Sequence, residues 1–306
     1  MKKRNLFSVG AMRAGSTSLY HYLSQHPDIF VPHRKEPGFF LAEEARNRLS
    51  IGGLSSEEQA QCHYVINKGR YHTEETYDSL YIESSSCSYR ADCSHYLHTP
   101  ATAKIIHEYN SEARILISLR APVERIYSEY MLYARVGKVS ESFPTFINQM
   151  LKKDEDGNVV IKTNSRLNKG FYAELIKPWL SYFGENQVKI IFFDDLKARP
   201  GEVCTDIYTW LGVDNAFKPN FVRAQRGGVP KSNKLMNAMK STLLVPQRVK
   251  NKIPASLRWR IKDLIYSKAL EREEMREDIN ILLKNLYRPY VCDLEALLNT
   301  NLTAWK

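Results

Sequence analysis

Short apolar runs alternate with segments of helical spacing along most of the chain. The apolar runs are of strand type and cover residues 5–9, 81–84, 115–119 and 188–193, with a shorter extended segment at residues 28–32. Apolar residues at helical spacing occur in residues 18–23, 102–109, 123–136, 172–183 and 203–211. Strands separated by helices predict an α/β fold, with a central parallel sheet of four or five strands flanked by helices on both faces.

Two regions depart from this pattern. Residues 42–80 are polar and irregular, with helical fragments at residues 55–65, and we interpret them as a variable insertion. Residues 142–151 predict a short helix, and the run Asp-Glu-Asp-Gly-Asn at residues 154–158 predicts a turn.

The composition shifts at about residue 231. Lysine and arginine become frequent, strand signals disappear, and helical spacing dominates to the end, with a charged, solvated helix at residues 270–285. We therefore predict a core at residues 1–230 and a C-terminal helical extension at residues 231–306 that packs on it, as a single domain overall. In the alternative, six cations of the extension form an amphipathic surface for membranes or anionic glycans. They are Arg248, Lys250, Lys252, Arg258, Arg260 and Lys262.

Composition agrees with one soluble enzyme domain. Of the 306 residues, 43% are hydrophobic and 25% are charged, which is ordinary for a globular protein. No stretch approaches the ~20 apolar residues of a membrane span, and the basic residues 1–4 lead into the first strand rather than into a secretory signal. The five cysteines are odd in number and lack Cys-x-x-Cys spacing, which favours reduced thiols in a cytoplasm and argues against zinc.

The formal net charge of +10 predicts negatively charged partners. A doubly phosphorylated ligand would use some of this charge, and an acidic acceptor or a membrane surface could use more. The basic residues are spread along the chain and are not gathered into an arm or an aromatic-interleaved stripe. Nucleic acid is therefore not expected as a partner.

Residues 10–17, Gly-Ala-Met-Arg-Ala-Gly-Ser-Thr, join the first predicted strand to the first predicted helix. Such a turn aims backbone N–H groups and the positive end of a helix dipole at one point, which suits a phosphate oxygen. A nucleotide triphosphatase would need Gly-Lys-Ser/Thr at the end of this loop. Here Ser16 follows Gly15 directly and the only cation is Arg13, so the loop is P-loop-like but ATP is disfavoured as its ligand.

A second phosphate-binding pattern follows the strand at residues 115–119. Arg120 stands at the carboxyl end of this strand, Pro122 opens the next helix, and Ser128 lies within it. An arginine at a strand end and a hydroxyl further along the following helix can converge on a second phosphate, to which arginine supplies paired charged donors.

Both patterns resemble those of the sulfotransferases that use PAPS (3′-phosphoadenosine-5′-phosphosulfate), in particular the bacterial and glycan-modifying branch with its heparan sulfate sulfotransferase domains. The resemblance spans about residues 5–230 and implies PAPS as donor, PAP as product and no metal. It implies that the 5′-phosphosulfate is bound by Arg13, Ala14, Gly15, Ser16 and Thr17. It assigns the 3′-phosphate to Arg120 and Ser128, with Arg226, Gly227 and Gly228 in a basic loop that closes over the 3′-phosphate and adenine.

The resemblance also implies a catalytic base. Glu36, in Lys-Glu-Pro-Gly-Phe-Phe at residues 35–40, matches the glutamate that takes the acceptor proton in glycan sulfotransferases, and Gly38 stands where many relatives have histidine. His33 is a rival base by residue type. Arg13 replaces a lysine that is more frequent in the family; because arginine stays charged, Arg13 is expected to stabilise the leaving phosphate without acting as an acid.

Residues 83–86, Glu-Ser-Ser-Ser, resemble the second-strand motif of the family, with Ser84 in place of a lysine. The predicted function is transfer of the sulfuryl group of PAPS to a hydroxyl or amine of a carbohydrate, polysaccharide or glycolipid. The alternatives are sulfation of a small secondary metabolite and, from other classes, a P-loop kinase or a catalytically idle nucleotide-binding protein.

Overall fold

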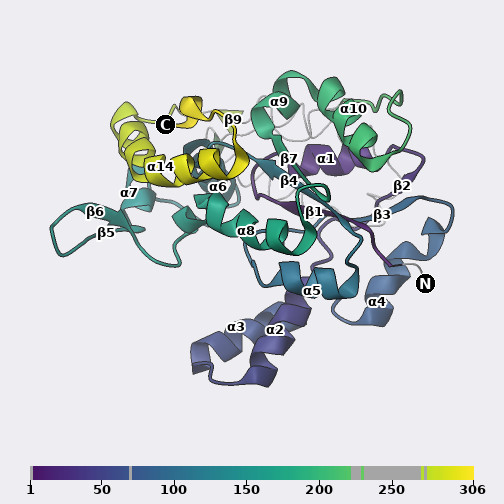
Figure 1. Cartoon of the computed structure of the whole chain (residues 1–306). Helices are drawn as coiled ribbons and strands as arrows, with labels where there is room; N and C mark the ends of the chain where they lie inside the picture. Colours follow the sequence, from purple (N-terminus) through teal and green to yellow (C-terminus); the bar gives the residue numbers. More distant parts are fainter. Residues whose placement is uncertain (1–2, 69–70, 222–228, 231–269, 272–273) are drawn as a thin grey trace. The chain divides into compact units, whose positions relative to one another are not determined.

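The computed structural model describes residues 3–68, 71–221, 229–230, 270–271 and 274–306 (Figure 1). The chain forms two compact units. The first contains Met1–Arg120 and Tyr172–Val222, and the second contains Ala121–Phe171 and Arg223–Lys306. The boundary predicted at residue 230 rests on composition and stays a prediction.

A five-stranded parallel sheet forms the centre of the first unit, in the order β2-β3-β1-β4-β7. The strands are β1 (Leu6–Gly10), β2 (Ile29–Phe30), β3 (Tyr89–Asp92), β4 (Arg114–Leu119) and β7 (Val188–Phe192). Strands β1 and β4 are almost completely buried, as expected for parallel strands covered on both faces. The predicted α/β fold with a parallel sheet is confirmed.

Helices cover both faces of this sheet (Figure 1). On one face lie α1 (Ser16–Leu23), α9 (Phe193–Ala198) and α10 (Pro200–Leu211), whose apolar residues form a buried core with the strands. On the other face lie α5 (Thr102–Tyr109) and α8 (Tyr172–Phe183). Helices α1, α5, α8 and α10 were predicted, because their apolar residues recur at helical spacing; the short α9 was not.

The connection between β2 and β3 contains the largest departures from the sequence predictions. Residues 42–80 are more regular than expected and form α2 (Phe39–Ile51), α3 (Ser56–Lys68) and α4 (Glu74–Asp78). The strand predicted at residues 81–84 is wrong: these residues belong to the 3-10 helix η1 (Ser79–Ser84), and the strand that joins the sheet is β3. The motif proposed at residues 83–86 therefore does not follow a strand of the sheet.

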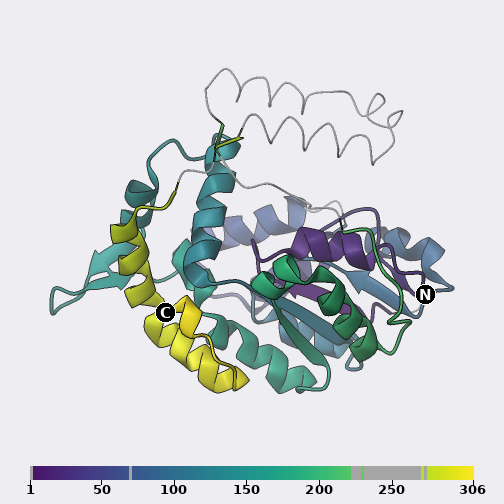
Figure 2. The same cartoon turned by 90° about the horizontal axis from the view of Figure 1, so that it is seen from above.

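The second unit is mainly helical (Figure 2). It contains α6 (Pro122–Arg135), α7 (Phe143–Asn148), η2 (Arg166–Gly170), α14 (Glu277–Leu298) and η3 (Thr303–Trp305). Strands β5 (Leu151–Lys153) and β6 (Val159–Ile161) form a hairpin around the predicted turn. Strand β8 (Val229–Pro230) pairs with β9 (Leu270–Glu271), so the predicted helix at residues 270–285 is wrong at its start and begins only at residue 277. The six cations proposed for a membrane or glycan surface lie outside the described residues.

Buried charges tie the elements of the second unit together. Arg125 and Glu129 of α6 are completely buried and form an ion pair at 2.7 Å. Glu129 also pairs with Arg166 at 3.2 Å and with Lys169 at 3.9 Å, both of η2. Burial opposes ionisation of Glu129, but the surrounding cations outweigh it and lower its pKa. Helix α6 is therefore fixed to η2 by a carboxylate that stays charged.

Candidate active site

The loop at residues 10–17 connects β1 to α1 in the conformation that its glycines permit. Gly10, Arg13 and Gly15 have φ angles of 131°, 67° and 90°, all in the left-handed region. A Cβ atom on Gly15 would lie 2.9 Å from carbon atoms of Leu196 and of Phe193. Glycine at position 15 is therefore required both by the backbone conformation and by the packing of α9.

Hydrogen bonds fix this loop to the neighbouring strand β4. The Ala11 N–H donates to the Ser118 carbonyl at 2.7 Å, and the Ser118 hydroxyl donates to the Ala14 carbonyl. The Met12 N–H donates to His98 Nε2 at 3.3 Å. These bonds connect the loop to β4 and to His98.

The end of α1 that faces the loop has no side-chain cap. Gly15 is the N-cap residue and supplies no side-chain acceptor, so the first-turn N–H groups can donate to a bound anion. Arg13, Ser16 and Thr17 are each partly exposed at this end. The residues present therefore fit the 5′-phosphosulfate assigned to them by resemblance.

Arg120 lies against the same loop. Its Nη1 donates to the Arg13 carbonyl at 3.3 Å, and its guanidinium stacks over the Phe193 ring at 4.7 Å. The Tyr172 hydroxyl donates to the Arg120 carbonyl at 2.8 Å. The structure thus brings together Arg13 and Arg120, which are far apart in the sequence.

The other proposed phosphate ligands lie elsewhere in the chain. Ser128 is a residue of α6, in the second unit, and is partly exposed. Arg226, Gly227 and Gly228 lie outside the described residues. Their assignment to the 3′-phosphate and adenine stays a prediction.

Glu36 is connected to the loop through Lys35. Glu36 has a left-handed φ of 60°, and its side chain is 43% exposed. Its Oε1 accepts from Lys35 Nζ at 2.8 Å and pairs with His95 Nε2 at 3.1 Å. Lys35 Nζ also donates to Thr17 Oγ1 at 2.9 Å, so the candidate base and the first turn of α1 share one ammonium.

These contacts decide the charge and orientation of Glu36. Burial would raise its pKa, but His95 and Lys35 outweigh burial and lower the pKa to about 2. Both partners bind Oε1, and within the described residues Oε2 has none. Glu36 is therefore ionised, and its Oε2 atom stays available for a further hydrogen bond.

His95 is a functional candidate that the sequence analysis missed. It belongs to the segment after β3, and its Nε2–H donates to Glu36 while Nδ1 is buried near Gly10. The imidazole that contacts Glu36 thus comes from a segment almost sixty residues further along the chain. His95 follows shortly after strand β3 (Tyr89–Asp92), which is the feature that could have identified it. The apolar pattern of the sequence predicts this strand at residues 81–84 and so does not connect it with His95.

A buried carboxylate holds the two halves of this arrangement together. Asp92, at the end of β3, is completely buried and accepts from the hydroxyls of Tyr77, Tyr96 and Ser94 at 2.7, 2.8 and 2.6 Å. The Ser94 hydroxyl in turn accepts from the Gly38 N–H at 3.1 Å. The turn that carries Glu36 is therefore bonded directly to the segment that carries His95.

The rival base is not part of this arrangement. His33 is exposed and forms no hydrogen bond or ion pair within the part of the chain that the structure describes. Glu83 is exposed on η1, and the Ser84 hydroxyl donates to the Tyr81 carbonyl at 2.6 Å. Of the two candidate bases, Glu36 is the one that Lys35 connects to the loop at residues 10–17.

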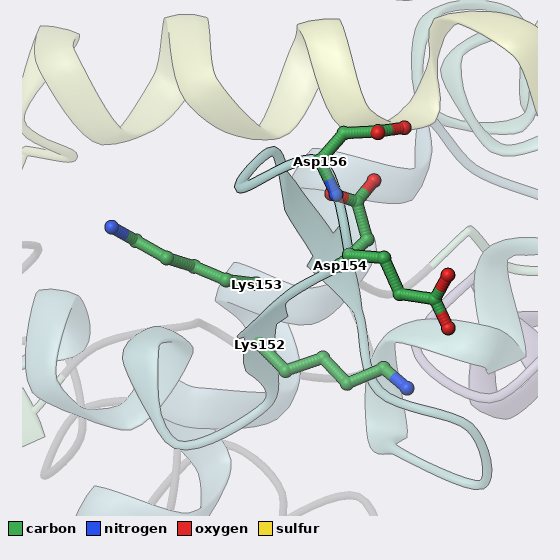
Figure 3. A pocket seen from close by; sticks show the side chains of 5 residues that line it. Lys152, Lys153, Asp154 and Asp156 are labelled. Carbon is green, nitrogen blue, oxygen red and sulfur yellow. The ribbon is translucent and has the colours of Figure 1, made fainter.

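A shallow pocket in the second unit lies at the β5–β6 hairpin (Figure 3). It is lined by five charged side chains, Lys152, Lys153, Asp154, Glu155 and Asp156. Asp154 Oδ1 accepts from the N–H groups of Asp156 and Asn158 at 3.1 and 2.8 Å, so its carboxylate serves the turn. None of the predicted site residues lines this pocket. Over all described residues, no group of three or more His, Cys, Asp or Glu residues could hold a metal ion, and no helix is long and apolar enough to cross a membrane.

Comparison with known proteins adds independent findings. A profile described as "Sulfotransferase family" matches residues 5–218. Human carbohydrate sulfotransferase 15 is 26% identical over 244 residues, which cover 68% of this chain and 44% of that protein. Human bifunctional heparan sulfate N-deacetylase/N-sulfotransferase 1 is 24% identical over 218 residues, which cover 69% of this chain and 22% of that protein. The chain thus spans less than half the length of these curated relatives.

One solved structure is similar over the whole chain. The sulfotransferase from Alicyclobacillus acidocaldarius is 26% identical, with a TM-score of 0.69, and the match covers 100% of this chain and 99% of that one.

Proposed function

The chain belongs to the sulfotransferase family, and from that premise we propose that it transfers the sulfuryl group of PAPS to a hydroxyl or amine of a carbohydrate acceptor. One observation carries the proposal: Lys35 contacts both Thr17 of the phosphate-binding loop and the Glu36 carboxylate. The candidate donor-binding loop and the candidate proton acceptor are thus connected within the first unit, which supports in-line transfer between them.

Residues of the loop would hold the donor. The uncapped N-terminus of α1 and the charge of Arg13 suit the 5′-phosphosulfate, and Arg120 suits a further phosphate because a guanidinium binds phosphate through paired donors. The donor supplies an activated sulfuryl group, and PAP is the product after transfer. Nothing in this arrangement requires a metal ion.

The chemistry assigns one role to each group. Glu36 Oε2 takes the proton of the acceptor hydroxyl or amine as the new bond to sulfur forms. The bond between sulfur and the 5′-phosphate oxygen breaks, and its electron pair stays on that oxygen. Arg13 and the N–H groups of the loop stabilise the charge that develops there. The proton on Glu36 then passes to water.

A glycan acceptor is supported by two observations. The relatives named above are a carbohydrate sulfotransferase and a heparan sulfate N-sulfotransferase, and the chain itself carries a net charge of +10, which suits an acidic polysaccharide. A small secondary metabolite is the competing acceptor class.

A transfer assay with labelled PAPS tests the acceptor. The panel contains polysaccharides, glycolipids and small hydroxylated or amine-bearing metabolites, and we expect label in the polysaccharide or glycolipid fractions. Label confined to small metabolites would refute the carbohydrate acceptor. Binding of PAP without turnover on any acceptor would refute an enzymatic function.

Calorimetry with PAP and with ATP plus Mg²⁺ tests the donor. We expect PAP to bind without metal and ATP to bind poorly, because the loop has no lysine placed to bridge the β- and γ-phosphates. Tight ATP binding with no PAP binding would identify a P-loop kinase instead.

A further inference from the structure

Lys35 lies between the two groups on which sulfuryl transfer depends. Its Nζ donates to Thr17 Oγ1 at 2.9 Å and to Glu36 Oε1 at 2.8 Å. Thr17 is in the first turn of α1, and Glu36 is the candidate base. The Lys35 side chain is 23% exposed, so most of it is buried against its neighbours. A cation in such a place acts on neighbouring charges more strongly than one in bulk water.

The charge of Lys35 affects the pKa values of two neighbouring groups. The pKa of His21, on α1, is lowered first by burial and then by the charge of Lys35. Burial and the Asp92 carboxylate raise the pKa of the Cys93 thiol to about 12, and the charge of Lys35 opposes them. The field of the ammonium therefore reaches both α1 and the segment after β3.

The loop itself offers a different cation. Arg13 stands where the family more often has lysine, and its backbone is fixed in a left-handed conformation with its carbonyl bound by Arg120. A guanidinium spreads its charge over a planar fork, whereas an ammonium is a compact point charge. In-line transfer concentrates negative charge on the sulfonate oxygens and on the departing phosphate oxygen, where a compact cation stabilises it best.

We propose that Lys35 is the catalytic cation of this chain and takes the place of the missing loop lysine by donating a hydrogen bond to the transferring sulfonate. An ammonium has three N–H donors, and the contacts of Lys35 within the described residues use two of them. The third remains for a sulfonate oxygen. The proposal rests on the proposed function, because it requires a sulfonate at this end of α1. Lys35 forms no covalent bond; it stabilises charge while the bonds to sulfur exchange and the acceptor proton goes to Glu36.

The first test measures nucleotide affinity without an acceptor. Calorimetry gives the Kd of PAPS and of PAP for the wild type, Lys35→Ala and Lys35→Gln. Because Lys35 faces the sulfonate, its loss should weaken PAPS binding by about 10- to 100-fold and PAP binding by less than about 2-fold. The control is Lys104→Ala, an exposed lysine of α5 that pairs with Glu108 at 3.7 Å. Equal weakening of both nucleotides, or of neither, overturns the assignment.

The second test is a rescue of turnover. Lys35→Ala should lower kcat by about 10²- to 10³-fold, and adding Arg13→Lys should recover at least roughly 10-fold of that loss, because it returns an ammonium to the loop. A lysine that only supported the turn at Glu36 would not be rescued from position 13. Absence of rescue overturns the proposed replacement. Lys35→Gln keeps most of the side-chain stem and serves if the alanine variant does not fold.

The proposed function and the role of Lys35 can be refuted separately. A wild-type chain that binds neither PAPS nor PAP refutes the proposed function and with it the role of Lys35. A wild type that binds PAPS, beside a Lys35 variant with an unchanged ratio of PAPS to PAP affinity, refutes the role of Lys35 alone.

Discussion

Replacing Glu36 by glutamine tests the proton-acceptor role that we propose for this residue. Glutamine keeps the shape of the side chain, and its carbonyl oxygen can still accept from Lys35 and His95 at the Oε1 position. An amide nitrogen then occupies the Oε2 position, where it donates hydrogen bonds and has no basic lone pair. The geometry of the site is retained, whereas the basic oxygen at the Oε2 position is lost.

The size of the effect follows from the pKa of Glu36. A positioned acid–base group contributes about 10²- to 10⁴-fold to a rate, and most when its pKa lies near the working pH. Because His95 and Lys35 lower the pKa of Glu36 to about 2, Glu36 is a weak base at neutral pH. We therefore expect a loss of kcat at the lower end of that range, about 10²-fold or ~2.7 kcal/mol of activation free energy.

Initial rates with labelled PAPS measure kcat, and calorimetry with PAP shows whether donor binding is intact. The controls are Glu83→Gln, an exposed carboxylate of η1, and His33→Gln, the rival base, both of which should keep nearly full turnover. Near-normal turnover in Glu36→Gln, or an equal loss in His33→Gln, would show that the acceptor proton goes elsewhere.

Three further predictions concern the support of the site and of the second unit. His95→Leu removes a partner that lowers the pKa of Glu36, so the acid limb of the pH profile of kcat/KM should move up by about 1 to 2 pH units; an unmoved limb contradicts the pairing. Gly15→Ala forces a side chain into the left-handed φ of 90° and against α9, and urea unfolding should show a loss of about 1–3 kcal/mol, whereas unchanged stability contradicts this packing. Glu129→Ala leaves Arg125 buried without its carboxylate and should cost about 3–5 kcal/mol at pH 7 in urea unfolding. Because the pKa of Glu129 is lowered, its stabilising contribution is complete above about pH 4.5 and falls in acid, so the difference between variant and wild type should shrink there; a pH-independent difference contradicts the assignment.

The parts of the fold that the sequence predicts are those governed by apolar periodicity. Strands β1, β4 and β7 are runs of apolar residues, and they lie close to their predicted positions. Strand β3 was missed because it contains Arg90 and Asp92, whose burial depends on partners from other elements. The buried Asp92 accepts hydrogen bonds from the hydroxyls of Tyr77, Tyr96 and Ser94. Such a network cannot be predicted from the local sequence pattern.

The candidate site likewise contains residues that local spacing identifies and residues that only the folded chain brings together. The loop at residues 10–17 and Arg120 could be identified from local spacing, because a strand, a glycine turn and a helix follow each other directly. His95 could not, since its relation to Glu36 depends on the turn between β2 and α2 being bonded to the end of β3. The bridging position of Lys35 was missed for a similar reason: the sequence shows its neighbour Glu36 but not its contact with Thr17.

The strand order has a consequence for how this protein can change. Strands β3 and β2 lie on one side of β1 in the sheet, and β4 and β7 lie on the other; from β1 the chain runs to β2, and from β4 it runs on to β7. The connections leaving β1 and β4 therefore diverge, and the carboxyl ends of these two adjacent strands border a topological switch point, where open α/β sheets form a crevice without any dedicated insertion. This switch point is a property of the strand order, whereas α2, α3 and α4 are inserted between the outermost strand β2 and its neighbour β3. Of these helices, α4 and the start of α2 are tied to the end of β3, because Tyr77 donates to Asp92 and the Gly38 N–H donates to Ser94. We therefore expect changes in length to be tolerated in α3, where they leave the loop at residues 10–17 undisturbed.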